Sequence, residues 1–170
     1  MKVDNNFEIF KKEIKTEILD AYYSDKRNFN IEITDEFLAW FIKTGTFFSE
    51  THLTIPQDII VTKTTPGNCF HNSQVVSLQN EGIRYFEGII RGVKNGKIIH
   101  HGFNISDDKI FDVSHLSNKK SFLDELKDET FFYFGVEIGN NIIKKTPDIL
   151  EVKFLNNSLI LNSYQESIAL

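Results

Sequence analysis

A single cysteine, Cys69, is the residue of this chain best suited to nucleophilic chemistry. It follows Pro66-Gly67-Asn68, a strong turn signal, and opens a segment whose pattern predicts a helix over residues 69–81. Free backbone N–H groups and the helix dipole stabilise negative charge at that end, so the thiolate is favoured there. A thiolate is a nucleophile that needs a base. The alternative is that a lone cysteine is only a small buried apolar side chain.

Two adjacent histidines, His100 and His101, fall on the second strand of a predicted hairpin. Asn95-Gly96 between two apolar runs predicts a two-residue turn, which places His101 opposite Ile90. Because neighbouring residues of a strand point to opposite faces, His101 is expected on an apolar face and His100 on a polar, solvent-facing side. We therefore predict that His101 is the base for Cys69, with a structural core histidine as the alternative.

An acid that could orient His101 follows a second turn, predicted at Asp107-Asp108. A two-residue turn there places Asp112 opposite Phe103 and diagonal to His101, on the same face. We expect Asp112 to accept the Nδ1 proton of His101, which leaves Nε2 facing the thiol of Cys69. One extra loop residue would turn Asp112 to the other face, where it would bond nearby backbone instead.

Four short motifs between residues 65 and 115 resemble those of a known group of enzymes. They read GNCFHNS at 67–73, YFEG at 85–88, HGFN at 101–104 and DVS at 112–114. They resemble small papain-like thiol hydrolases, the broad group that includes NlpC-type peptidases and transglutaminase-like proteins. More closely, they resemble small phage and bacterial proteins reading Gly-x-Cys-Phe-x-Asn-Ala, Tyr-x-Glu-Gly, His-Ala-Trp and then Asp-x-Thr.

The resemblance implies a catalytic triad of Cys69, His101 and Asp112 in that chain order. The cysteine would open a helix, and the other two residues would lie on the sheet. The chemistry would be acyl transfer from an amide or related acyl bond through a Cys69 thioester. Peptidase, amidase, deamidase and transferase activities share this chemistry, and the triad does not separate them. The alternative from another class is a non-catalytic protein-binding module on the same fold.

Other polar residues near the triad have their own expected roles. Asn72 could bind substrate, but an asparagine near a helix start usually bonds local backbone. Glu87 faces away from His101 and is interpreted as a structural acceptor of hydrogen bonds. The backbone N–H of Cys69 is the expected oxyanion donor, and Ser114, opposite His101, could orient the imidazole.

A zinc site is the remaining chemical alternative. The candidate ligands are Cys69, His71, His100, His101 and His115. Their spacing argues against it, because adjacent strand histidines point to opposite faces and a single cysteine forms no Cys-x-x-Cys pair. We predict no metal and no cofactor.

The composition narrows the class of protein. The chain has 170 residues, 41% of them hydrophobic, and a net charge of −5, which predicts one folded domain and disfavours a nucleic-acid binder. A lone cysteine excludes an internal disulfide. No apolar run is long enough for a membrane span and no signal peptide is evident, so we expect a cytoplasmic protein, with delivery by a non-classical secretion route left open. The expected partner is a protein, peptide or other amide-containing substrate.

The elements that must position the triad follow from the hydrophobic periodicity. Helices are predicted at 6–24, after a cap at Thr34, at 69–81 and at 121–127; strands are predicted at 58–63, 84–93, 97–106, 109–114 and 131–138, with weaker ones at 151–154 and 158–161 before a loose tail. Helices followed by an antiparallel sheet indicate an α+β fold. We expect one papain-like domain, 1–170, with a helical amino-terminal part (1–55), a catalytic core (65–138) and carboxy-terminal strands and tail (139–170).

Overall fold

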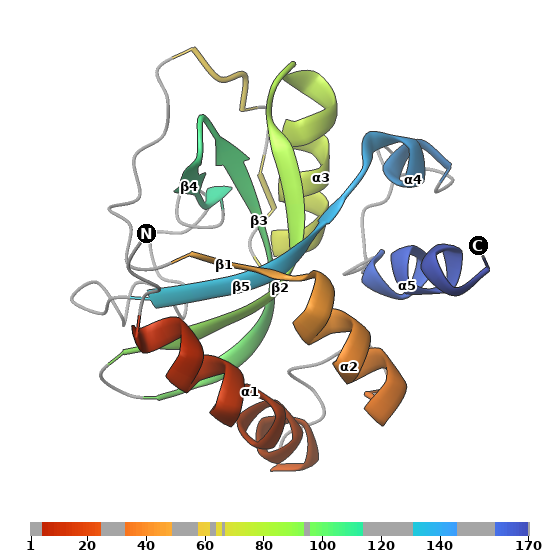
Figure 1. Cartoon of the computed structure of the whole chain (residues 1–170). Coiled ribbons are helices and arrows are strands. Elements are labelled where there is room, and N and C mark those ends of the chain that lie inside the picture. Colours follow the sequence, from red (N-terminus) through yellow and green to blue (C-terminus); the bar gives the residue numbers. More distant parts are fainter. Residues whose placement is uncertain are drawn as a thin grey trace.

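The computed structural model describes residues 5–24, 33–48, 58–61, 64–65, 67–93, 96–113, 131–145 and 159–169. Its elements in chain order are α1 (Asn5–Ser24), α2 (Asp35–Thr44), β1 (Thr46–Phe48), α3 (Cys69–Gln79), β2 (Arg84–Gly92), β3 (Ile98–Ser106), β4 (Lys109–Phe111), β5 (Phe131–Ile138), α4 (Asn140–Lys145) and α5 (Ile160–Ile168). The strands form one curled antiparallel sheet in the order β1-β5-β2-β3-β4 (Figure 1). The predicted α+β class is therefore confirmed.

The hairpin of β2 and β3 differs from its predicted register by two residues. His101 pairs with Gly88 rather than with Ile90. The reason is a longer loop: Gly92 N donates to Lys97 O at 3.0 Å, so the connection comprises residues 93–96 instead of Asn95-Gly96 alone. Because side chains alternate with a period of two, this shift leaves every residue on its predicted face. The turn at Asp107-Asp108 has the predicted length, with both residues at positive φ.

The two faces of the sheet have different coverings. The face that we call the helix face carries Tyr85, Glu87, Ile89, His100, Gly102 and Asn104, and the aromatic face carries Phe86, Ile90, His101, Phe103 and Tyr133. Helix α3 packs on β3 and β2, α1 packs on β3, and α2 and α5 pack on β5 (Figure 1). The helices anchor through a shared apolar core that includes buried side chains of α1, α2 and α5. Helices from both ends of the chain therefore cover the helix face of the sheet.

The amino-terminal helices form as predicted. Ile14 and Ile18 of α1 are buried one turn apart, and Thr34 caps α2 by accepting a hydrogen bond from Phe37 N at 3.2 Å. Phe41 of α2 meets Phe134 of β5 edge-on, with 5.0 Å between ring centroids. These contacts fix α1 and α2 over the helix face.

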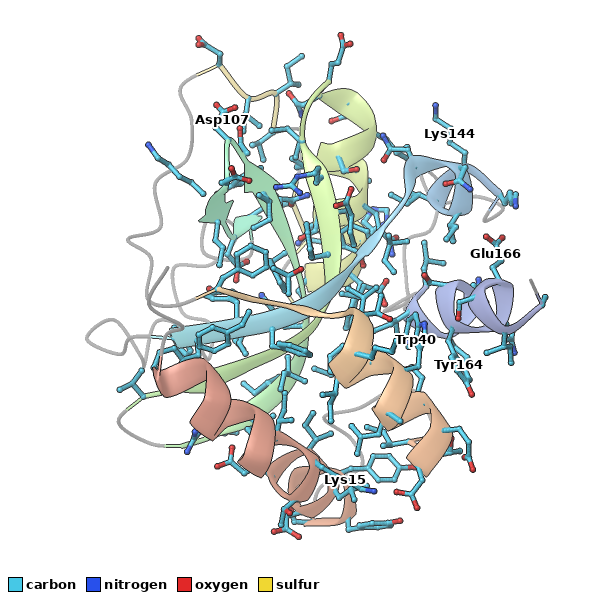
Figure 2. The ribbon with its side chains drawn as sticks, viewed as in Figure 1. Lys15, Trp40, Asp107, Lys144, Tyr164 and Glu166 are labelled. Atoms are coloured by element: carbon cyan, nitrogen blue, oxygen red, sulfur yellow. The ribbon has the colours of Figure 1, made fainter. Side chains whose placement is uncertain are left out.

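The carboxy-terminal region corrects a prediction. Residues 158–161 were expected as a strand and the rest as a loose tail, but helix α5 begins at Ile160. The Glu87 carboxylate accepts hydrogen bonds from the N–H groups of Leu159 and Ile160, at 2.6 and 2.9 Å, and so holds the start of this helix. On α5, Tyr164 faces Trp40 of α2, with ring centroids 5.3 Å apart (Figure 2). Long-range contacts therefore override a local pattern that fits a strand.

Smaller differences concern the segments around α3. Residues 58–61 form no strand; instead the backbone N–H and C=O of Ile60 bond the side chain of Asn80. Helix α3 ends at Gln79, two residues earlier than predicted, because Asn80 takes an extended conformation (φ −127°, ψ 118°), in which its side chain bonds Val76 O. The helix predicted at 121–127 and the strand at 151–154 lie outside the described residues. None of the helices described in the structure is long and apolar enough to cross a membrane.

Candidate active site

Cys69 is held at the first position of α3 by the side chain of Asn72. The Asn72 Oδ1 accepts from Thr65 N at 2.9 Å, and its Nδ2 donates to Thr65 O at 2.8 Å. These two hydrogen bonds hold the segment before the helix in place, so the interpretation of Asn72 as a residue that bonds local backbone is confirmed. Asn68 is the N-cap residue but makes no side-chain capping bond. The Asn68 side chain therefore does not take up the first-turn N–H groups beside the thiol.

Two hydrogen bonds and a close backbone contact hold the start of α3 against β3, next to His101. Ser73 Oγ donates to Gly102 O at 3.0 Å, and Asn104 Nδ2 donates to Ser73 O at 2.9 Å. A Cβ atom on Gly102 would lie 2.9 Å from the Cα of Phe70, so only glycine allows this approach. Within the described residues, β4 pairs with β3 from Asn104 to Ser106. Sequence reasoning missed Ser73 and Asn104 because each bonds a distant backbone carbonyl.

His101 and Asp112 meet as predicted, but through the other ring nitrogen. His101 Nε2 lies 2.5 Å from Asp112 Oδ2, and both residues are buried, with exposed fractions of 4% and 2%. The expectation that Nδ1 would bond Asp112 is therefore wrong. Strand alternation fixes the face on which a histidine lies, but rotation of its ring about χ2 decides which nitrogen points where. The arrangement leaves Nδ1 free to bond the thiol.

The Cys69 sulfur lies close enough to the imidazole of His101 to interact with it. Burial alone would lower the pKa of His101, but the charges of Asp112 and Cys69, with the hydrogen bonds to both, raise it well above 6.5. The imidazolium form is thus favoured between a carboxylate and the sulfur. A histidine beside a cysteine at a helix start can serve as the base or acid for a thiol nucleophile.

His100 lies on the opposite face, as predicted, but it does not face solvent. Its exposed fraction is 5%, and its ring packs on Phe70 with 4.8 Å between centroids. The prediction failed because α1 and α2 cover this side of the sheet: Ile18 and Leu38 line a small apolar cavity beside His100. Burial, and then the charge of His101, lowers the pKa of His100 to about 3. His100 is therefore a neutral core residue on the far side of the strand from the aromatic face.

Two further buried polar side chains lie on opposite faces of the sheet, Glu87 on the helix face and Tyr133 on the aromatic face. Glu87 is fully buried and accepts from Tyr85 Oη at 2.5 Å as well as from the start of α5, which confirms its interpretation as a structural acceptor. Tyr133 of β5 donates from its hydroxyl to Asp112 Oδ2 at 3.5 Å. Sequence reasoning missed Tyr133; the only signal was a hydroxyl within a run of phenylalanines.

The zinc alternative gains no support in the described part of the chain. No group of three or more His, Cys, Asp and Glu side chains that could hold a metal ion occurs there. His100 and His101 point to opposite faces, so they cannot share a metal. His115, a candidate ligand, and Ser114, expected to orient His101, lie outside the described residues.

Neither a protein-family model, nor a curated protein, nor a solved structure matches this chain. Function must therefore be inferred from the chemistry of the site itself. That site contains a helix-opening cysteine, a buried histidine that interacts with it, and a buried carboxylate that bonds the histidine.

Proposed function

We propose that Cys69, His101 and Asp112 form the catalytic triad of a papain-like thiol enzyme that transfers acyl groups from a protein, peptide or other amide-containing substrate. One observation carries the proposal: the buried imidazole of His101 bonds Asp112 through Nε2 and also interacts with Cys69. The position of Cys69 at the start of a helix packed on the strand that bears His101 supports a papain-like arrangement.

The first half of the reaction forms a thioester. The Cys69 thiolate attacks the acyl carbon, and the C=O electron pair moves onto the oxygen. The backbone N–H of Cys69 at the helix start is suited to stabilise that oxyanion. The His101 imidazolium then gives its Nδ1 proton to the leaving nitrogen, the C–N bond breaks, and the amine or ammonia departs.

The second half releases the acyl group. Neutral His101 takes a proton from water as the water oxygen attacks the thioester carbon. The C–S bond breaks, the carboxylic acid leaves, and the thiolate–imidazolium pair is restored. An amine in place of water gives transfer, and loss of ammonia from a side-chain amide in the first half gives deamidation. Substrate and acceptor, rather than the triad, decide among these outcomes.

Asp112 keeps the transferable proton on the nitrogen that faces sulfur. Because Oδ2 accepts the Nε2 hydrogen, the ring is held with Nδ1 towards Cys69. Asp112→Asn can turn its amide N–H towards Nε2 and favour the wrong tautomer. In a serine-protease triad the comparable change costs about 10⁴ in rate. A thiolate already paired with imidazolium needs less tautomer control, so we expect a loss of about 10 to 10³, or about 1.4 to 4 kcal/mol of barrier.

The test is trapping of the thioester. Wild type and Cys69→Ser are incubated with activated esters and with glutamine-containing peptides, and intact mass spectrometry measures acyl adducts. We expect a hydroxylamine-sensitive adduct on Cys69 of the wild type and no such thioester on the serine variant, whose melting temperature should be nearly unchanged. Ammonia release and new amino termini then separate deamidation from peptide cleavage. No adduct with any acyl donor, together with ordinary alkylation of Cys69, would favour the binding-module alternative.

A further inference from the structure

The hydroxyl of Tyr133 is a buried polar group for which the mechanism above has no role. Tyr133 lies on β5 with an exposed fraction of 1%, and its ring packs edge-on against Phe103 at 5.1 Å between centroids. A buried hydroxyl in an aromatic environment costs free energy unless it finds a partner. A phenylalanine at this position would avoid that cost, and β5 already contains three phenylalanines, at 131, 132 and 134.

The partner of this hydroxyl is the acid of the triad. Tyr133 Oη donates to Asp112 Oδ2 at 3.5 Å, and the same oxygen lies 2.5 Å from His101 Nε2. The two donors therefore reach one carboxylate oxygen from different strands, β5 and β3. Burial, followed by the charge of Asp112, raises the pKa of Tyr133 well above 10. The phenol thus stays protonated and acts as a donor throughout the neutral range.

We propose that Tyr133 is a positioning residue of the triad, whose hydroxyl holds the Asp112 carboxylate with Oδ2 facing His101. This inference rests on the proposed function of Cys69, His101 and Asp112. Without the hydroxyl, the carboxylate can rotate about χ2 and its bond to the imidazole weakens. The imidazolium then loses part of its stabilisation, so His101 supports attack by the Cys69 sulfur less well.

The experiment measures the rate of iodoacetamide alkylation of Cys69 at pH 6. Tyr133→Phe is expected to slow it about three- to tenfold, a modest effect because the bond is long and acts through Asp112. In an Asp112→Ala background the same change should cause no further slowing, since the hydroxyl no longer has a carboxylate to hold. A residue that only supports packing would slow both backgrounds equally, so a double-mutant cycle separates the two roles.

Tyr85→Phe is the matched control, because Tyr85 is also buried and bonds a carboxylate, Glu87, on the opposite face. It should lower the melting temperature but leave the alkylation rate within twofold of wild type. Site-specific 3-fluorotyrosine at position 133 keeps the ring and makes its hydroxyl a stronger donor, so a rate at or above wild type is expected.

Three results would overturn the proposal for Tyr133. One is a Tyr133→Phe rate within twofold of wild type, another is equal slowing in both backgrounds, and the third is a fluorotyrosine variant as slow as the phenylalanine variant. A failure of the triad itself looks different: His101→Ala would then leave the wild-type alkylation rate unchanged.

Discussion

Acid should destabilise this fold partly through His100. The pKa of His100 is lowered from 6.5 to about 3 by burial and then by the charge of His101. A histidine with a depressed pKa binds its proton in the unfolded chain first, so its contribution makes stability fall as pH drops from about 6.5 towards 3. At pH 4.5, two units below the pKa of an unfolded histidine, protonation of this residue lowers the free energy of unfolding by about 3 kcal/mol relative to pH 7. That is a large share of the 5–15 kcal/mol typical of a folded protein.

The assay compares wild type with His100→Leu, which fills a similar volume in the apolar surroundings of Ile18 and Leu38. Urea unfolding at pH 7 and at pH 4.5 gives the free energy of unfolding of each protein. Wild type should lose about 3 kcal/mol more than the variant between these pH values. His71→Gln is the control, because His71 is only half-buried; it should reproduce most of the wild-type loss. Equal losses for wild type and His100→Leu would refute the assignment of His100 as a buried neutral residue.

Four further substitutions test how the fold and the site are held. Gly102→Ala should destabilise the protein by about 1–3 kcal/mol and slow alkylation of Cys69, because the new Cβ meets the backbone at Phe70 and displaces the start of α3; unfolding and alkylation measurements check both. Glu87→Gln should cost about 3 kcal/mol in urea unfolding, since an amide nitrogen cannot accept the N–H groups at the start of α5. Thr34→Ala should cost about 1 kcal/mol in the same assay and Asn68→Ala less than about 0.5, because only the threonine makes a capping bond.

The meeting of His101 and Asp112 was predictable because it depends on the parity of strand positions. The predicted β2–β3 register was wrong, yet an error of two residues returns every side chain to its own face. The β3–β4 turn had the predicted length, and so Asp112 lies where expected. Strand alternation does not determine how the imidazole ring is rotated, and for this reason the nitrogen that bonds Asp112 was predicted wrongly.

The parts that sequence could not predict depend on segments far away in the chain. His100 was assigned to the correct face, but only the packing of α1 and α2 makes that side a core. Residues 158–161 suit a strand locally, but helix α5 begins at Ile160, where Glu87 on β2 accepts the N–H groups of Leu159 and Ile160. Tyr133 reaches Asp112 from a strand that pairs with β2 rather than β3. Each of these contacts needs the assembled sheet.

The most direct test of the thiolate–imidazolium pair is the alkylation rate of Cys69 at pH 6 in wild type, His101→Ala and His100→Leu. An ordinary thiol with a pKa of about 8.5 is only about 0.3% ionised at that pH. We predict that folded wild type reacts at least about tenfold faster than such a thiol, that His101→Ala loses this advantage, and that His100→Leu keeps it. If His101→Ala reacts as fast as wild type, or if the folded protein reacts no faster than an ordinary thiol, Cys69 and His101 do not form a reactive pair.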